Sequence, residues 1–130
     1  LLDRWTDGRL KLFVTASGLR LRGESGALRD GDYLPLATEG DHARHAIAFA
    51  RRLGDDWAVT VVPRLTTRLA RGRWPLRAEV WGDTAVRLPA DTPSSWRDAF
   101  TGSAVEADAA GRVPVGDLLT DLPVAVVVRA

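Results

Sequence analysis

The residues with the most obvious chemical potential are two pairs of carboxylates. Asp30 with Asp32, and Asp55 with Asp56, could supply the two carboxyl groups, about 5 to 9 Å apart, that glycosidases place across a sugar bond. Both pairs lie in glycine-containing segments, where aspartate commonly caps the backbone or shapes a turn. We therefore interpret both pairs as turn residues and expect no catalytic residue among them.

A pair of histidines is the second candidate. His42 and His45 stand three residues apart, a spacing that could share a metal ion on a helix. Here they precede a predicted strand, and no third ligand is evident. The chain also has no cysteine, no glycine-rich phosphate loop and no serine in a nucleophile-elbow motif. We expect neither a metal site nor a cofactor site.

The stretch 64–78 is basic and contains one aromatic residue, Trp74. It has no acidic residue, and its arginines could bind phosphate while Trp74 stacks on a ring. Because the net charge of the chain is only +1 and no nucleic-acid-binding motif occurs, we interpret the stretch as a solvated loop or an interface to another domain, with no nucleic-acid partner. Trp74 is kept as a candidate glucan contact.

The elements that must position these residues follow from length and periodicity. The chain has 130 residues, of which 45% are hydrophobic, as expected for one soluble domain. Its longest apolar run, 124–128, is too short to span a membrane. Residues 1–78 carry 14 basic and 9 acidic groups, whereas 79–130 carry 4 and 8, which predicts one basic and one acidic face.

The first predicted element is an amphipathic helix over 8–22, with Asp7 as its N-cap and Gly23 at its end. The segment 24–32 reads as a connector, with a short turn at 27–28. The helix has an apolar stripe at helical spacing. The stripe consists of Leu10, Phe13, Val14, Ser17 and Leu21.

The later chain alternates with the period of a β-strand, and turn signals recur about every ten residues. Glycine and aspartate at 54–56 predict a hairpin. The fold class is therefore mainly β, a sandwich preceded by one helix. We expect Trp5, Trp57, Trp81 and Trp96 in the core or at a domain interface. The predicted strands are 33–37, 45–53, 57–62, 84–88, 96–100, 112–115 and 123–129.

Several segments, taken in order, resemble the C-terminal end of the maltooligosyltrehalose synthases, members of the α-amylase family. The most specific are DGRLKLFVT at 7–15 and GDYLPL at 31–36. Weaker similarity continues at 45–51, 61–65, 80–84 and 96–102. The resemblance implies that 1–23 ends with the last helix of an upstream catalytic (β/α)₈ barrel, that 24–32 is a connector, and that 33–130 is a C-terminal β-sandwich.

The same resemblance implies a function for the parent enzyme. Such enzymes are isomerases of trehalose biosynthesis, which convert the reducing-end α-1,4 bond of a malto-oligosaccharide to an α,α-1,1 bond. Their catalytic carboxylates lie on the barrel, so none is carried over to this sequence, and the expected partner of this region is the barrel itself. We expect a cytoplasmic protein without cofactor or membrane partner. The alternatives are a starch- or glycogen-binding module and a protein-interaction domain.

Overall fold

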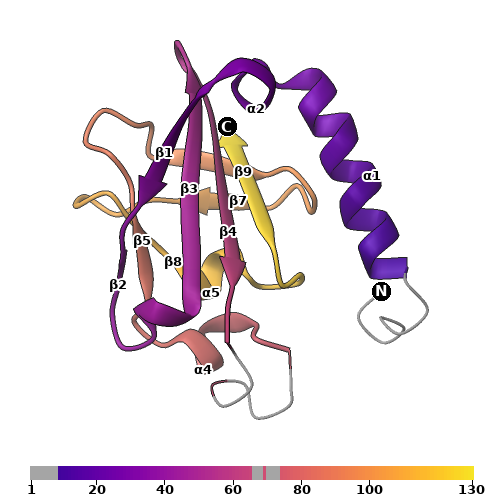
Figure 1. Ribbon diagram of the computed structural model, residues 1–130. Helices are drawn as coiled ribbons and strands as arrows, with labels where there is room; N and C mark the ends of the chain where they lie inside the picture. Colours follow the sequence, from indigo (N-terminus) through magenta and orange to yellow (C-terminus); the bar gives the residue numbers. More distant parts are fainter. Residues whose placement is uncertain (1–8, 66–68, 70–73) are drawn as a thin grey trace.

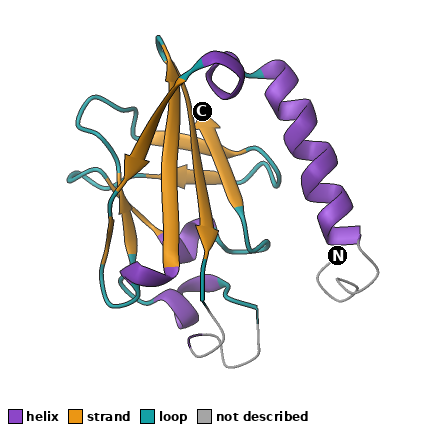
Figure 2. Cartoon of the chain, in the orientation of Figure 1, coloured by secondary structure: helices purple, strands orange, loops and turns teal. Residues whose placement is uncertain are grey.

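Two antiparallel β-sheets form the body of the protein, and a long helix precedes them (Figures 1 and 2). The computed structural model describes residues 9–65, 69 and 74–130. Valines on both sheets enclose a common core, with Val59 and Val127 on one side and Val86 and Val113 on the other. The predicted mainly-β fold after a helix is thus confirmed.

The larger sheet has six strands in the order β1-β3-β4-β9-β6-β7, and the smaller has three in the order β2-β5-β8. The six strands are β1 (Asp32–Leu36), β3 (Ala46–Leu53), β4 (Asp56–Pro63), β9 (Ala125–Arg129), β6 (Ser95–Asp98) and β7 (Ala104–Glu106). The other three are β2 (Thr38–Glu39), β5 (Ala85–Arg87) and β8 (Arg112–Pro114).

The β3–β4 hairpin shows how the alternating pattern builds the larger sheet. Ala46, Ala48 and Ala50 of β3 are buried, while Ile47 between them is 45% exposed. Successive side chains of a strand point to opposite faces, so this alternation gives the sheet one inner and one outer face. Gly54, at φ 61°, lies in the two-residue loop between the paired residues at 53 and 56. The predicted hairpin is confirmed.

Helix α1 (Arg9–Glu24) extends beyond the predicted end at residue 22. Gly23 lies inside the helix rather than at its end, which corrects the sequence interpretation. The chain then enters a second helix, α2 (Gly26–Asp30), where only a turn was predicted. The buried Ser25 explains this short helix, because its hydroxyl accepts a hydrogen bond of 3.3 Å from the Leu28 N–H as an N-cap.

Several short elements differ from the predictions. The expected strand at 96–100 stops at Asp98, because this side chain binds the following backbone N–H groups and turns the chain. The expected strand at 112–115 gives way to helix α5 (Val115–Leu118). The expected strand at 84–88 is shorter, and β2 and β7 were not predicted.

Helix α4 (Arg77–Trp81) was also not predicted, and it packs against α5. Trp81 is fully buried, and its Nε1 donates a hydrogen bond of 2.8 Å to the Pro75 carbonyl. Trp57 and Trp96 are also buried, so the core positions expected for these three tryptophans are confirmed. Trp5 lies outside the described residues.

Candidate functional site

The side of α1 that faces away from the sheets is apolar and uncovered. Leu12 and Leu19 lie seven residues apart on this side, and their side chains are 69% and 64% exposed. Ala16 lies between them and is also exposed. We call these three residues the outer stripe. Apolar side chains at helical spacing are normally covered by a neighbouring layer, so the outer stripe is a candidate docking surface.

The opposite side of α1 faces the larger sheet. The half-buried positions Phe13, Val14, Ser17 and Leu21 are those of the predicted stripe, whereas the Leu10 side chain lies outside the described residues. The rings of Phe13 and Phe100 lie 6.4 Å apart between their centroids. The predicted stripe therefore turns toward this chain's own sandwich, and α1 carries apolar side chains on two sides.

A groove of about 360 Å³ separates α1 from the outer face of the larger sheet. Helix α1 lies beside β9 along this groove (Figure 1). The groove has apolar residues along its floor and arginines around it. Its lining residues are Gly18, Leu21 and Arg22 of α1, Leu28 and Arg29 of α2, Phe49 and Arg51 of β3, Thr60 of β4 and Val126 of β9. We call this space the α1 groove.

An aromatic pair extends the apolar surface from the groove to the edge of the sheet. The rings of Tyr33 and Phe49 lie 5.3 Å apart, and Tyr33 is 62% exposed. Ile47 is exposed on the same outer face. Tyr33, Phe49 and Ile47 therefore form an apolar surface on the outer face of β1 and β3.

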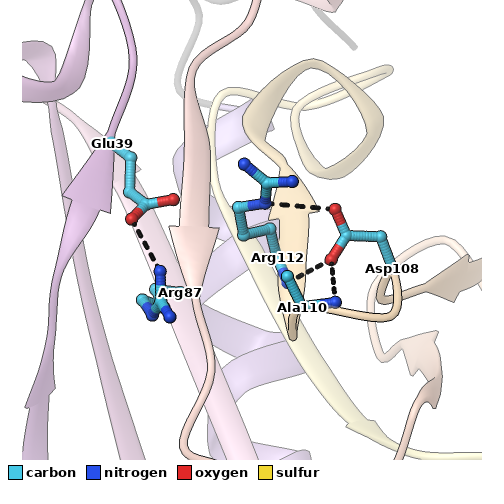
Figure 3. A network of polar contacts seen from close by, with 5 residues as sticks. All are labelled: Glu39, Arg87, Asp108, Ala110 and Arg112. Carbon is cyan, nitrogen blue, oxygen red and sulfur yellow. Dashed lines mark hydrogen bonds and ion pairs between the residues drawn. The ribbon is translucent and has the colours of Figure 1, made fainter.

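The outer face of the smaller sheet has the opposite character, because carboxylates surround it. Glu39 and Arg87 form an ion pair of 3.1 Å between neighbouring strands, and Asp108 and Arg112 form another of 3.2 Å (Figure 3). Both pairs are exposed to solvent, so they contribute little to stability. A shallow hollow of about 480 Å³ here is lined by the carboxylates Glu39, Asp83, Glu106, Asp108 and Asp117.

Two carboxylates of this acidic face, Asp83 and Asp108, accept hydrogen bonds from backbone N–H groups and so have a structural role. The backbone N–H of Arg112, with that of Ala110 and the Arg112 guanidinium, lowers the pKa of the Asp108 carboxyl. Asp83 accepts a hydrogen bond of 2.9 Å from the Asp41 N–H. These contacts stabilise turns.

Asp98 is the one buried carboxylate in the described part of the chain. Burial raises the pKa of the Asp98 carboxyl, and the nearby Asp121 carboxylate adds a smaller increase. Hydrogen bonds from the N–H groups of Phe100 and Thr101 and from the Thr101 side chain partly offset this by lowering the pKa. Its Oδ1 lies 2.8 Å from the Phe100 nitrogen and 3.1 Å from the Thr101 nitrogen. Asp98 thus serves the turn after β6.

The carboxylate pairs considered in the sequence lie in the loops and at the ends of elements on either side of β1 and β3. Asp30 and Asp32 are exposed at the end of α2 and the start of β1. Asp55 is exposed in the hairpin loop, and Asp56 accepts a hydrogen bond of 3.0 Å from the Ala27 N–H. Asp56 therefore ties α2 to the β3–β4 hairpin, a structural role that the sequence did not reveal.

The two histidines lie close together, with ring centroids 6.3 Å apart. His45 Nδ1 lies 3.2 Å from the Arg64 carbonyl, and its Nε2 lies 3.4 Å from the Arg44 Nε. If the Arg44 guanidinium donates to Nε2, the Nδ1–H donates to the carbonyl. Among the residues that the structure describes, no group of three or more metal-binding side chains occurs.

Trp74 is half-buried and has an interaction partner. Its neighbours at 66–68 and 70–73, which hold most of the basic stretch, lie outside the described residues. The glucan contact stays a prediction.

The helices of the described part of the chain are all too short or too polar to span a lipid bilayer.

No protein-family model matches the chain. It is 36% identical over 122 residues to a protein named "Putative maltooligosyl trehalose synthase" from Mycobacterium tuberculosis (strain CDC 1551 / Oshkosh), and equally to its counterpart in strain ATCC 25618 / H37Rv. The match covers 92% of this chain and 14% of either relative. The chain therefore corresponds in sequence to a region of maltooligosyl trehalose synthases, and the match agrees with the C-terminal region that the motifs indicated.

Proposed function

We propose that this chain is the non-catalytic C-terminal domain of an enzyme that isomerises the reducing-end α-1,4 bond of a malto-oligosaccharide to an α,α-1,1 bond. The domain packs on the catalytic barrel of the same polypeptide and stabilises it. The match to two relatives of much greater length supports a place within a larger enzyme. The barrel supplies the catalytic carboxylates, as barrel enzymes generally place them at strand ends.

The observation that carries the docking role is the two-sided apolar character of α1. One side, with Phe13 and Leu21, faces this chain's own sheet. The other side presents Leu12 and Leu19 to solvent. A helix with apolar side chains on both sides belongs between two layers, and the outer stripe supplies the second contact. The barrel is the layer that we place there.

The sandwich holds α1 in a defined orientation for this contact. The Ser25 N–H donates a hydrogen bond of 2.8 Å to the Leu21 carbonyl, so the last turn of α1 continues into the junction. Arg29 of α2 donates to the Gly23 carbonyl at 2.7 Å. Asp56 anchors α2 to the hairpin. Through these contacts the sandwich positions the outer stripe, which is the role that we assign to it.

The experiment compares the 130-residue chain with the polypeptide encoded when its reading frame is followed upstream of Leu1. We expect the longer polypeptide to convert maltopentaose, with loss of reducing ends and formation of a terminal trehalose unit by NMR. The 130-residue chain alone should be inactive. Activity of the isolated chain, or an upstream frame without a barrel, would overturn the proposal.

Leu12→Glu and Leu19→Glu test the docking surface itself. In the 130-residue chain both side chains are exposed, so each change should alter the free energy of unfolding by only about 0.5 kcal/mol or less. In the longer polypeptide each should lower the melting temperature, since a charge would then be buried against the barrel. Leu65→Glu, at a leucine that is 71% exposed, is the control and should leave both proteins unchanged. Equal melting temperatures for all three variants of the longer polypeptide would exclude this surface.

A further inference from the structure

The floor of the α1 groove is a single row of side chains across three strands. Phe49 of β3 lies opposite Thr60 of β4, and Thr60 lies opposite Val126 of β9. All three side chains line the groove. Residues opposite one another in neighbouring antiparallel strands share a face of the sheet, so this row presents a largely apolar strip toward α1.

The next row on the same face places an arginine at either end. Arg51 lies opposite Ala58, Ala58 opposite Val128, and Val128 opposite Arg97. Three strand spacings separate the two arginines, a distance of about 14 Å between their backbones. Arg22 of α1 and Arg29 of α2 line the groove from above, and no carboxylate is among the residues described as lining it. The groove therefore combines an apolar floor with a positive border.

Two of these arginines, Arg22 and Arg97, have no partner among the residues that the structure describes. The other two have partners: Arg51 donates a hydrogen bond of 3.1 Å from its Nε to the Gly31 carbonyl, and Arg29 forms an ion pair of 3.7 Å with Asp30. Within the described part of the chain, the side chains of Arg22 and Arg97 make no hydrogen bond or ion pair. Arginine forms paired hydrogen bonds with carboxylates readily, so these two guanidinium groups are available to an acidic ligand.

Gly18 keeps the helix wall of the groove open. A Cβ added at Gly18 would have no heavy atom within 4 Å, so packing within this chain does not require glycine here. Glycine inside a helix costs roughly 1 kcal/mol relative to alanine. A wall without a side chain leaves room for a ligand above the Phe49–Thr60–Val126 row.

We infer that the α1 groove binds a peptide segment with apolar side chains flanked by carboxylates. The apolar side chains lie on Phe49 and Val126, and the carboxylates pair with Arg22, Arg51 and Arg97. Charge complementarity favours such a segment over a glucan, which carries no charge to match the arginines. The groove lies on the side of α1 opposite the outer stripe, so this inference goes beyond the proposed function and does not depend on it.

The test measures peptide binding to the isotope-labelled 130-residue chain by NMR. The probe is the blocked peptide acetyl-Asp-Asp-Leu-Phe-Asp-Asp-amide, and its uncharged counterpart carries Asn in place of each Asp. We expect saturable shifts of the backbone amides of Phe49, Arg51 and Val126 with the acidic peptide. Its affinity should exceed that of the uncharged peptide by about fivefold or more, the contribution of roughly 1 kcal/mol from the charge pairs.

Matched variants locate the binding. Gly18→Leu fills the groove, and Arg22→Glu reverses one charge, so each should weaken the acidic peptide at least about fivefold. Gly23→Leu and Arg20→Glu are the controls on the same helix, and they should bind as the unmodified chain does. Open space around Gly23 and exposure of Arg20 make both controls compatible with folding.

Three results would overturn the inference: no saturable binding, equal binding of the two peptides, or binding that Gly18→Leu leaves unchanged. Shifts confined to the acidic face of the smaller sheet would also count against it. The Leu12→Glu and Leu19→Glu experiment tests the proposed function on the other side of α1, so the two proposals can fail separately.

Discussion

Gly116 and Ala78 approach so closely that a Cβ on Gly116 would lie 2.8 Å from the Ala78 Cα. This contact joins α5 to α4, two helices that sequence periodicity did not predict. The backbone N–H of the neighbouring Arg77 donates a hydrogen bond of 2.8 Å to the Leu119 carbonyl, which further holds the two helices together. A side chain at position 116 would force them apart.

Gly116→Ala should therefore lower the free energy of unfolding by about 1 to 3 kcal/mol, the usual cost of overpacking a tight interior contact. Urea denaturation followed by tryptophan fluorescence measures this change, and the buried Trp81 reports on α4 directly. Gly23→Ala is the control, since its Cβ meets open space within a helix, and it should be neutral or stabilising. An unchanged midpoint for Gly116→Ala would contradict the tight contact.

Arg77 adopts φ 71°, which is unfavourable for a residue with a Cβ. Arg77→Gly should relieve this strain and stabilise the protein by up to about 1 kcal/mol, because the side chain is exposed and the backbone hydrogen bond is retained. Arg97→Gly in strand β6 should destabilise it, since glycine weakens an extended strand. Thermal melting of both variants provides the measurement, and a decrease for Arg77→Gly would show that the side chain contributes more than its strain costs.

Asp98 gives the stability a pH dependence with a defined sign. Burial raises the pKa of its carboxyl in the folded protein, so this group contributes stability that is present at acid pH and lost as the pH rises through that raised value. Asp98→Asn keeps an oxygen acceptor for the Phe100 and Thr101 N–H groups and removes the buried charge. It should be at least as stable as the unmodified chain at neutral pH, and this part of the pH dependence should disappear.

Asp98→Ala separates the hydrogen bonds from the charge. It leaves two backbone N–H groups in a partly buried turn without their acceptor, which should cost about 1 to 3 kcal/mol. Urea denaturation of both variants between pH 4 and pH 8 distinguishes the effects. If the Asn and Ala variants lost equal stability at neutral pH, the turn hydrogen bonds would not be the role of Asp98.

Asp56 anchors α2 through the Ala27 N–H, so its loss should open this region locally. Asp56→Ala should increase amide hydrogen exchange over 26–30 and in the last turn of α1, while the exchange of the sheet amides stays the same. Asp55→Ala is the matched control, because Asp55 is the exposed neighbour with no such contact. Identical exchange in the two variants would show that α2 is held by other contacts.

Local patterns in the sequence predicted the long elements well. The stripe through Phe13 and Leu21 marks the side of α1 that faces the sheet, and alternation at 46–53 predicted β3, because in both cases burial follows the period of the backbone. The short elements depend on distant partners. Helix α4 needs Gly116 opposite Ala78, and β2 needs β5, so no local signal predicts them.

The candidate docking surface was predicted only in part. Periodicity located one apolar side of α1, but Leu12 and Leu19 on the other side became evident only when exposure was known. The α1 groove depends on the register that aligns Phe49, Thr60 and Val126 from three separate strands. Such an alignment depends on the register between strands in the assembled sheet, and residue spacing within one segment does not predict it.

The position of β9 has a consequence for how the domain forms during synthesis. This last strand lies between β4 and β6, in the interior of the larger sheet. Until residues 125–129 leave the ribosome, no strand joins β4 to β6 by backbone hydrogen bonds, and the facing edges of these two strands stay unpaired. The emergence of β9, rather than the early appearance of the hairpin, therefore sets the moment at which the larger sheet can close, and a nascent chain stalled before residue 125 presents both edges to other molecules.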